Sequence, residues 1–162
     1  MSSRIRTFQD RIAALLLADT AHFVAAPAPS GDTRVPVIVD LPGDIDSIVN
    51  EALAATGIAC IVWMPSRAPK REQRAKNRRY VCHVWVKENV LLNRGAVGAQ
   101  TAEEIAELVD ELCDGKANGL TPHPIGGLGT IQLGEPGVVP IGGAEAAEND
   151  WEITLETEAL LR

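Results

Sequence analysis

The sequence has few cysteines, and their spacing excludes the sites that cysteines usually build. Cys60, Cys82 and Cys113 are odd in number, and no two lie close together along the chain. Neither a disulfide framework nor a zinc site of paired cysteines is therefore indicated. All three lie in apolar segments, which predicts small buried core residues.

Long apolar runs are also missing. No stretch approaches the roughly 20 apolar residues that a membrane helix needs, and Arg4, Arg6 and Arg11 interrupt the N-terminal region in a way that does not fit a signal peptide. We therefore expect cytoplasmic synthesis and no membrane partner. With 162 residues, 46% of them hydrophobic, the chain suits a single globular domain over residues 1–162 without a linker-bounded second one.

Motifs for catalysis or cofactor binding are absent as well. The glycine-rich stretch 126–130 precedes a possible strand and has no Walker lysine after it, so a turn is the better interpretation than a phosphate loop. His22, His83 and His123 are scattered, and Cys82 and His83 would point to opposite faces of a strand. No serine lies in a nucleophile elbow. These absences predict that the protein is not an enzyme and uses no cofactor or metal.

What the chain does have is a basic run between two apolar segments. Residues 58–64 and 80–86 are rich in β-branched and aromatic types, which predicts paired, largely buried strands. The basic loop between them, residues 67–79, exceeds the usual two to five residues of a hairpin loop, and extended arms would carry its tip roughly 20 Å off the sheet. Its basic residues are Arg67, Lys70, Arg71, Arg74, Lys76, Arg78 and Arg79. The sequence therefore predicts a long protruding β-hairpin.

The net charge of −7 conceals a separation of charge. The basic loop has seven basic residues and one acid, which gives +6, whereas the remainder has eight basic and twenty-one acidic residues, which gives −13. This pattern suits self-association, in which the loop of one subunit meets the acidic body of the next. Nucleic-acid binding is the alternative, but no aromatic residue interrupts the basic run and the acidic body would repel duplex DNA.

Hydrophobic periodicity predicts amphipathic helices at about 3–19, 44–57 and 101–115. The third has the capping-box spacing of Thr101 and Glu104. Its outward-facing acids are Glu103, Glu107, Asp110 and Glu111. A short strand is expected at 35–39, and residues 116–143 form a Gly/Pro-rich loop region with two possible short strands at 130–133 and 138–141. The order of elements predicts an α+β fold with a mixed or antiparallel sheet of four to five strands and the helices on one face.

The closing segment 151–158 alternates apolar and polar residues, which predicts a strand with one face in the core. Its other face presents Glu152, Glu156 and Glu158. A metal site is disfavoured there because no basic or histidine partner accompanies these carboxylates in the sequence. A solvated or subunit-facing surface is the better interpretation.

Taken together, these stretches resemble the tail terminator family of long-tailed bacteriophages, also called tail completion or minor tail proteins. The resemblance rests on the amphipathic N-terminal helix, the strand at 35–39, the hairpin over 58–86 and the apolar turn after Val84-Trp-Val-Lys-Glu-Asn89. It continues with the Thr-capped helix at 101–115 and the closing strand at 151–158. It covers most of the chain as a pattern of elements and size. The stretch 119–143 is longer than the connection usual in the family.

The resemblance implies a structural virion protein at the head-proximal end of the tail. Such proteins form a homohexameric ring on the tail tube, stop tube polymerisation and offer a surface for head–tail joining through a head-completion or connector protein. DNA then passes through the lumen without specific binding. We hypothesise that the basic loop makes intersubunit, tube or head contacts and that Glu152, Glu156 and Glu158 line an interface or the channel. A small nucleic-acid-binding protein or another neck protein is the alternative.

Overall fold

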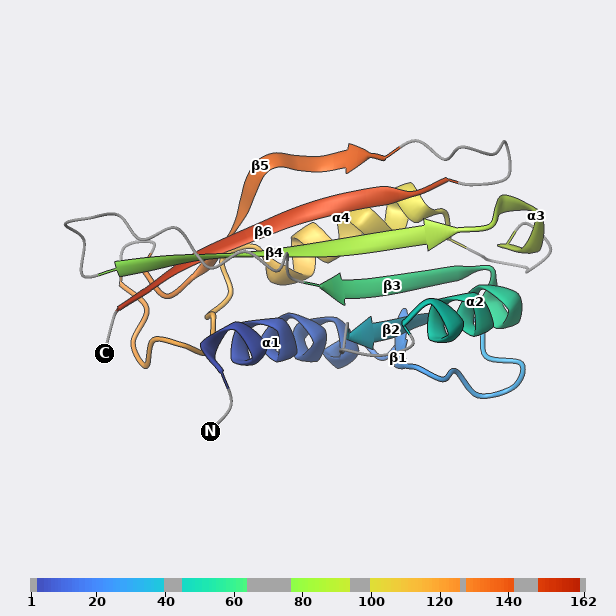
Figure 1. Cartoon of the computed structure of the whole chain (residues 1–162), viewed down its shortest axis with the longest axis horizontal. Helices are drawn as coiled ribbons and strands as arrows, with labels where there is room; N and C mark the ends of the chain where they lie inside the picture. The colour runs from blue at the N-terminus through green and yellow to red at the C-terminus, as the bar shows by residue number, and fades with distance from the viewer. Residues whose placement is uncertain are drawn as a thin grey trace.

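The computed structural model describes residues 3–39, 45–63, 77–93, 100–125, 128–141 and 149–160. These residues form a six-stranded mixed sheet in the order β1-β2-β3-β4-β6-β5, with four helices (Figure 1). The strands are β1 (Phe23–Ala25), β2 (Val35–Val39), β3 (Ile58–Trp63), β4 (Asn77–Glu88), β5 (Ile131–Pro140) and β6 (Trp151–Leu160). The helices are α1 (Arg4–Ala18), α2 (Ile45–Thr56), α3 (Val90–Asn93) and α4 (Ala102–Cys113). The α+β class with a mixed sheet is thus confirmed.

The sheet has more strands than the four to five predicted. Strand β1 was missed because it has only three residues, which pair in parallel with the start of β2. Strand β5 lies inside the region predicted as loop. The two weak strands expected there are one strand with an irregularity between Leu133 and Val138, and both of its parts pair with β6. Glycine and proline within this irregularity interrupt the strand-like composition, so the sequence pattern indicated two short strands in a loop instead of one strand.

The two faces of the sheet are covered by different helices. Apolar residues of α1 and α4 pack on the main core, together with Cys60, Cys82 and Leu155. Val49 and Ala52 of α2 instead pack against the alternate residues of β3 on the opposite face. Figure 1 shows α4 behind β4 and β6. The prediction of helices on one face was therefore wrong, because every residue of the interior strand β3 except its last is buried and its two faces need separate cover.

Strand β4 runs past the end of β3. The last pair between these two antiparallel strands is Trp63 with His83, whereas pairing with β6 continues to Asn77 (Figure 1). Six residues of β4 therefore extend beyond β3, or about 20 Å at the usual rise of a strand. Arg78 and Arg79 lie in this extension and not in the predicted loop, because the distant β6 supplies their backbone partners.

A buried carboxylate joins the ends of several elements. Glu88, the last residue of β4, is only 4% exposed. Its Oε1 accepts a hydrogen bond from the Nδ2 of Asn93 at 2.8 Å. Its Oε2 accepts from the backbone N–H of Ala102 and from the Nδ2 of Asn149, both at 2.9 Å. Glu88 thus connects β4 to α3, to the first turn of α4 and to the segment before β6.

The predicted capping box of α4 is present. The Thr101 hydroxyl accepts from the backbone N–H of Glu104, whose carboxylate accepts from the backbone N–H of Thr101. Thr101→Ala removes one of these two bonds and is expected to lower the free energy of unfolding by about 1 kcal/mol. Thr101→Ser keeps the acceptor and should cost much less. Urea denaturation of both variants is the check, and equal losses would contradict the capping role.

Candidate functional site

Most of the basic segment predicted as an interface lies outside the described residues. This part comprises Arg67, Lys70, Arg71, Arg74 and Lys76. Arg78 and Arg79 are the second and third residues of β4. Because consecutive strand residues point to opposite faces, Arg78 lies on the face that α1 and α4 cover and Arg79 on the other. The described part of the segment thus offers one cation to each face of the sheet.

A row of facing basic and acidic side chains crosses from β4 to β6 and the residue before it, on the face away from α4; two of its pairs are ion pairs and the third is a contact between an imidazole and a carboxylate. We call it the charge ladder; its pairs are Arg79–Glu156, His83–Glu152 and Lys87–Asp150. The Nδ1 of His83 lies 3.5 Å from the Oε1 of Glu152, and the Nζ of Lys87 lies 3.7 Å from the Oδ2 of Asp150. The ladder follows from the antiparallel register of the two strands, which sets odd positions of β4 beside even positions of β6.

The sequence indicated that Glu152, Glu156 and Glu158 of β6 have no basic or histidine partner. This was wrong for Glu152 and Glu156. Glu152 and Glu156 contact bases of β4 that lie about seventy positions earlier in the chain, and register at that separation cannot be read from a sequence pattern. Glu156 is further confined, since a Cβ added at Gly134 would lie 2.9 Å from its Oε2. Glu158 is exposed and has no ion pair among the described residues.

Aromatic side chains flank the charge ladder. The rings of Trp63 and His83 are stacked with centroids 5.2 Å apart, and Trp85 lies 5.9 Å from Trp63. The Nζ of Lys87 lies over the ring of Trp85, 5.4 Å from its centroid. Trp63 and Trp85 also pack against the α2 side of the sheet. This cluster holds the His83 ring in place by packing against Trp63.

The three cysteines are buried core residues, as predicted. Burial away from water raises the pKa of the Cys60 and Cys82 thiols far above the ordinary range, and it raises the pKa of Cys113 to about 12. At neutral pH these thiols are therefore protonated, and they lack the thiolate character that nucleophilic or metal-binding cysteines need.

The outward side of α4 is densely acidic. We call Glu103, Glu107, Asp110, Glu111 and Asp114 the acidic helix face; all are exposed except Asp110, which is partly buried. None of these carboxylates forms an ion pair with another described residue. The pKa of Asp110 is raised by burial and then by the nearby charges of Asp114 and Glu111. Sequence periodicity placed Glu103, Glu107, Asp110 and Glu111 outward, and the structure adds the C-cap residue Asp114. Only the structure shows that these acids lack compensating bases within the described residues.

Cationic groups gather where β4 extends beyond β3. We call Arg4, Arg78 and Tyr80 the cationic end. The Arg4 guanidinium lies over the Tyr80 ring, 5.9 Å from its centroid. Arg78 and Tyr80 are two residues apart on β4 and therefore share that face of the strand. The Nε of Arg78 and the hydroxyl of Tyr80 are buried and have no hydrogen-bond partner within the described part of the chain, although such groups normally have one.

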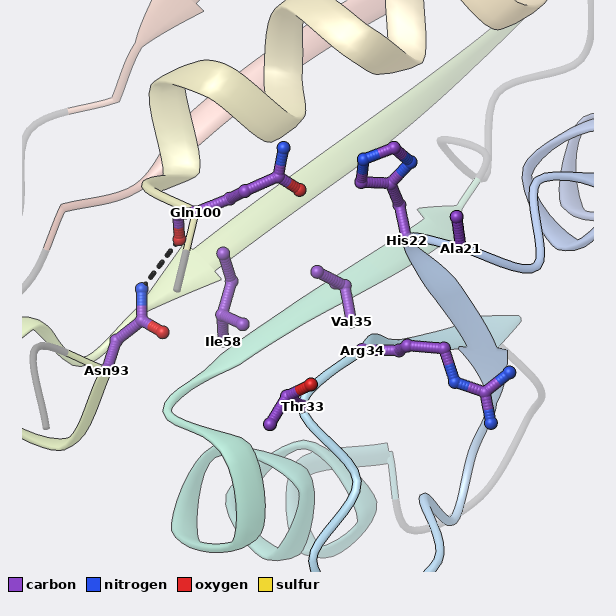
Figure 2. A pocket seen from close by; sticks show the side chains of 8 residues that line it. All are labelled: Ala21, His22, Thr33, Arg34, Val35, Ile58, Asn93 and Gln100. Carbon is purple, nitrogen blue, oxygen red and sulfur yellow. Dashed lines mark hydrogen bonds between the residues drawn. The ribbon is translucent and has the colours of Figure 1, made fainter. Parts of the chain in front are cut away.

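An open pocket of about 270 Å³ lies where β2 and β3 begin. Its lining residues are Ala21, His22, Thr33, Arg34, Val35, Ile58, Asn93 and Gln100 (Figure 2). Figure 2 shows the Gln100 side chain reaching towards the His22 ring, while the Arg34 guanidinium turns away. The Nδ1 of His22 is held by Asp19 at 2.7 Å. Most polar groups around the pocket are thus already used to hold neighbouring loops in place.

The ion pair beside this pocket gives a pH prediction. Arg34 donates hydrogen bonds to both carboxylate oxygens of Asp32, and this lowers the pKa of Asp32 to about 2. Because the folded-state pKa lies below the unfolded value, the stabilisation is complete above the unfolded value and is lost as the pH falls towards 2. Arg34→Ala should raise the pKa of Asp32 towards its ordinary value in an NMR titration of the carboxyl carbon. An unchanged pKa would contradict this assignment.

Comparisons with known proteins add no family to this description. No family model matches the chain, and no curated protein sequence matches it either. Within the described ranges, no three His, Cys, Asp or Glu side chains are grouped so that they could hold a metal ion. No helix in these ranges is long and apolar enough to cross a membrane.

Proposed function

We propose that this protein is a tail terminator of a long-tailed bacteriophage. In this proposal it forms a ring on the end of the tail tube, ends tube polymerisation and offers the surface for head–tail joining. The observation that carries the proposal is the extension of β4 beyond β3, because the basic residues 67–76 directly precede this extension in the chain. In this proposal the basic segment contacts a neighbouring molecule. The order α1, β2, β3–β4, α4, β6 also agrees with the resemblance.

The charge distribution supports an assembly in which a basic surface of one subunit contacts an acidic surface of the next. A ring is a head-to-tail assembly and needs two different complementary patches on each subunit. The basic segment 67–79 provides one patch, and the acidic remainder of the chain can provide the other. Glu152 and Glu156 contribute less to this than the sequence indicated, because His83 and Arg79 of the same chain already pair with them. Among the three predicted carboxylates, Glu158 is the exposed one.

The proposed passage of DNA follows from the same charges. Phosphate adheres to basic surfaces through the release of counterions and is repelled by acidic ones. A ring whose lumen is lined mainly by the acidic part of the subunit would let DNA slide through. In this proposal the protein is assembled in the host cytoplasm, resides at the head-proximal end of the tail and binds the tube protein and a head-completion or connector protein.

Tube capping in vitro tests the proposal. Tail-tube protein from the same phage would be polymerised with and without this protein, and tube length would be measured by electron microscopy. Capped tubes of limited length, with a ring at one end, are the expected result. Overgrown tubes, with this protein left in the soluble fraction, would exclude the function.

Charge reversal tests the basic segment. Arg71→Glu/Arg74→Glu/Arg78→Glu should abolish head–tail joining, since each interface would oppose like charges, and circular dichroism should show an unchanged fold. Lys116→Glu, a single reversal at an exposed residue away from the segment, is the control and should join normally. Normal joining by the triple variant would remove the segment from the mechanism. Salt-sensitive retention of DNA in a gel shift, without capping, would favour the nucleic-acid-binding alternative.

A further inference from the structure

The open pocket where β2 and β3 begin combines a buried apolar floor with polar side chains around it (Figure 2). Val35 and Ile58 form the floor and are each only 3% exposed. His22 and Gln100 are partly exposed and Thr33 is exposed, so a molecule from solvent can reach them. The volume of about 270 Å³ lies just below the roughly 300–1,000 Å³ of sites for drug-sized molecules, which favours a smaller ligand.

Asn93 presents a fixed hydrogen-bond acceptor to this pocket. Its Nδ2 donates to the Oε1 of Glu88 and to the backbone carbonyl of Gln100, both at 2.8 Å. These two bonds use both hydrogens of the amide and set its orientation, so the Oδ1 is the group that remains. No described residue donates to this oxygen, which is not one of the unpartnered polar atoms buried away from solvent, and Figure 2 shows it turned towards Ile58. A ligand in the pocket therefore has to offer it a donor.

His22 adds a second acceptor. Its Nδ1 lies 2.7 Å from the Oδ2 of Asp19, and because a carboxylate can only accept, the Nδ1 carries the proton. In the neutral ring the Nε2 then has the lone pair, and it bonds to no described residue. The hydroxyl of Thr33 and the side-chain amide of Gln100 can donate or accept, and within the described ranges they are also without a partner.

The charges around the pocket disfavour an ionic ligand. The Arg34 guanidinium is paired with Asp32 and turns away from the pocket (Figure 2). A carboxylate ligand would offer only acceptors, whereas Asn93 requires a donor. An ammonium ligand would have donors, but neither a carboxylate nor a tyrosine, tryptophan or phenylalanine ring is among the lining residues, so it would find no ion pair and no cation–π contact. The lining therefore suits an uncharged molecule that donates hydrogen bonds.

We propose that this pocket binds an uncharged, hydroxyl-rich small molecule of the size of a monosaccharide. A hydroxyl group both donates and accepts. Neighbouring hydroxyls on one sugar ring can therefore donate to Asn93 and His22 and exchange hydrogen bonds with Thr33 and Gln100, while the C–H groups of the ring cover the apolar floor. This inference is independent of the proposed function, because none of the lining residues belongs to the basic segment.

An NMR titration of the full chain tests the proposal. Amide signals would be followed while D-glucose, D-galactose and N-acetyl-D-glucosamine are added separately. At least one of these sugars should shift the signals of the lining residues in a saturable way, with a dissociation constant of about 1 mM, because the ligand is small and the site is open. Inorganic phosphate and methylammonium are the ionic probes and should leave these signals unchanged.

Two substitutions identify the binding groups. Gln100→Ala and Thr33→Val each remove a polar group that holds no described part of the fold, so each should weaken sugar binding about fivefold and leave the circular dichroism unchanged. Gln132→Ala, at an exposed glutamine of β5, is the matched control and should bind like the natural protein.

Three outcomes would overturn this site. The first is no saturable shift with any of the three sugars, and the second is shifts confined to residues away from the pocket. The third is tighter binding of phosphate or methylammonium than of the sugars. Equal affinity of Gln100→Ala, Thr33→Val and the natural protein would contradict the assigned hydrogen bonds. Capping of tail tubes tests the proposed function separately, so failure of one does not imply failure of the other.

Discussion

Glu88→Ala is expected to lower the free energy of unfolding by about 4 kcal/mol. The substitution leaves three donors without their acceptor: the side-chain amides of Asn93 and Asn149 and the backbone N–H of Ala102. Each unsatisfied buried donor costs about 1–3 kcal/mol, and entry of water recovers part of the sum. Urea denaturation followed by tryptophan fluorescence measures the loss.

Two further variants separate charge from shape at this position. Glu88→Gln keeps the size of the side chain but turns an N–H group towards a donor, so its cost should lie between those of the natural residue and alanine. Glu103→Ala removes an exposed acid from the same end of α4 and should change stability by less than about 1 kcal/mol. Equal effects at Glu88 and Glu103 would show that the buried network does not contribute the stability assigned to it.

Gly57→Ala is expected to destabilise the protein by about 3 kcal/mol. Gly57 ends the turn between α2 and β3 with φ +78°, a conformation that residues with a Cβ adopt only at a cost. A Cβ here would also lie 2.6 Å from the backbone nitrogen of Asn93. Because the atom that it would meet belongs to the backbone of α3, relief requires a shift of that helix and of the Glu88 network that holds it.

Gly115→Ala is the matched control for this prediction. Gly115 has a similar φ of +73°, but an added Cβ would meet no atom within 4 Å. It should cost only the conformational penalty of about 1 kcal/mol. The difference between the two variants in chemical denaturation measures the steric term alone. If both lose the same stability, the close approach of α3 to Gly57 is not a constraint.

Local patterns predicted the elements whose causes are local. The capping box at Thr101 is contained within four residues, and the alternation from Trp151 to Leu155 is set by a single strand. Strand β3 was expected over 58–64 and spans Ile58–Trp63, because its β-branched residues and the bounding Gly57 and Pro65 are all adjacent. In each case the residues that cause the element are neighbours in the sequence, so a local sequence pattern is enough to predict it.

Features that depend on distant partners could not be predicted in this way. The length of β4 is set by pairing of Asn77 with Leu160, so the strand begins earlier than its own composition indicates. The ion pair of Arg79 and Glu156 depends on the same register. The buried state of Glu88 depends on donors from three other segments, and a single acidic residue at the end of a strand gives no sign of them. The candidate site is therefore only partly visible in the sequence.

The charge ladder has a consequence for what the molecule presents to its surroundings. The cations Arg79 and Lys87 and their carboxylate partners lie on neighbouring strands or directly beside them, about 4.8 Å apart, so the fields of each pair largely cancel within a Debye length of about 8 Å at physiological salt. A charged polymer approaching that side would experience little force until it was almost in contact. Long-range attraction and repulsion are then left to surfaces whose charges form no ion pair with another described residue, such as the acidic helix face of α4.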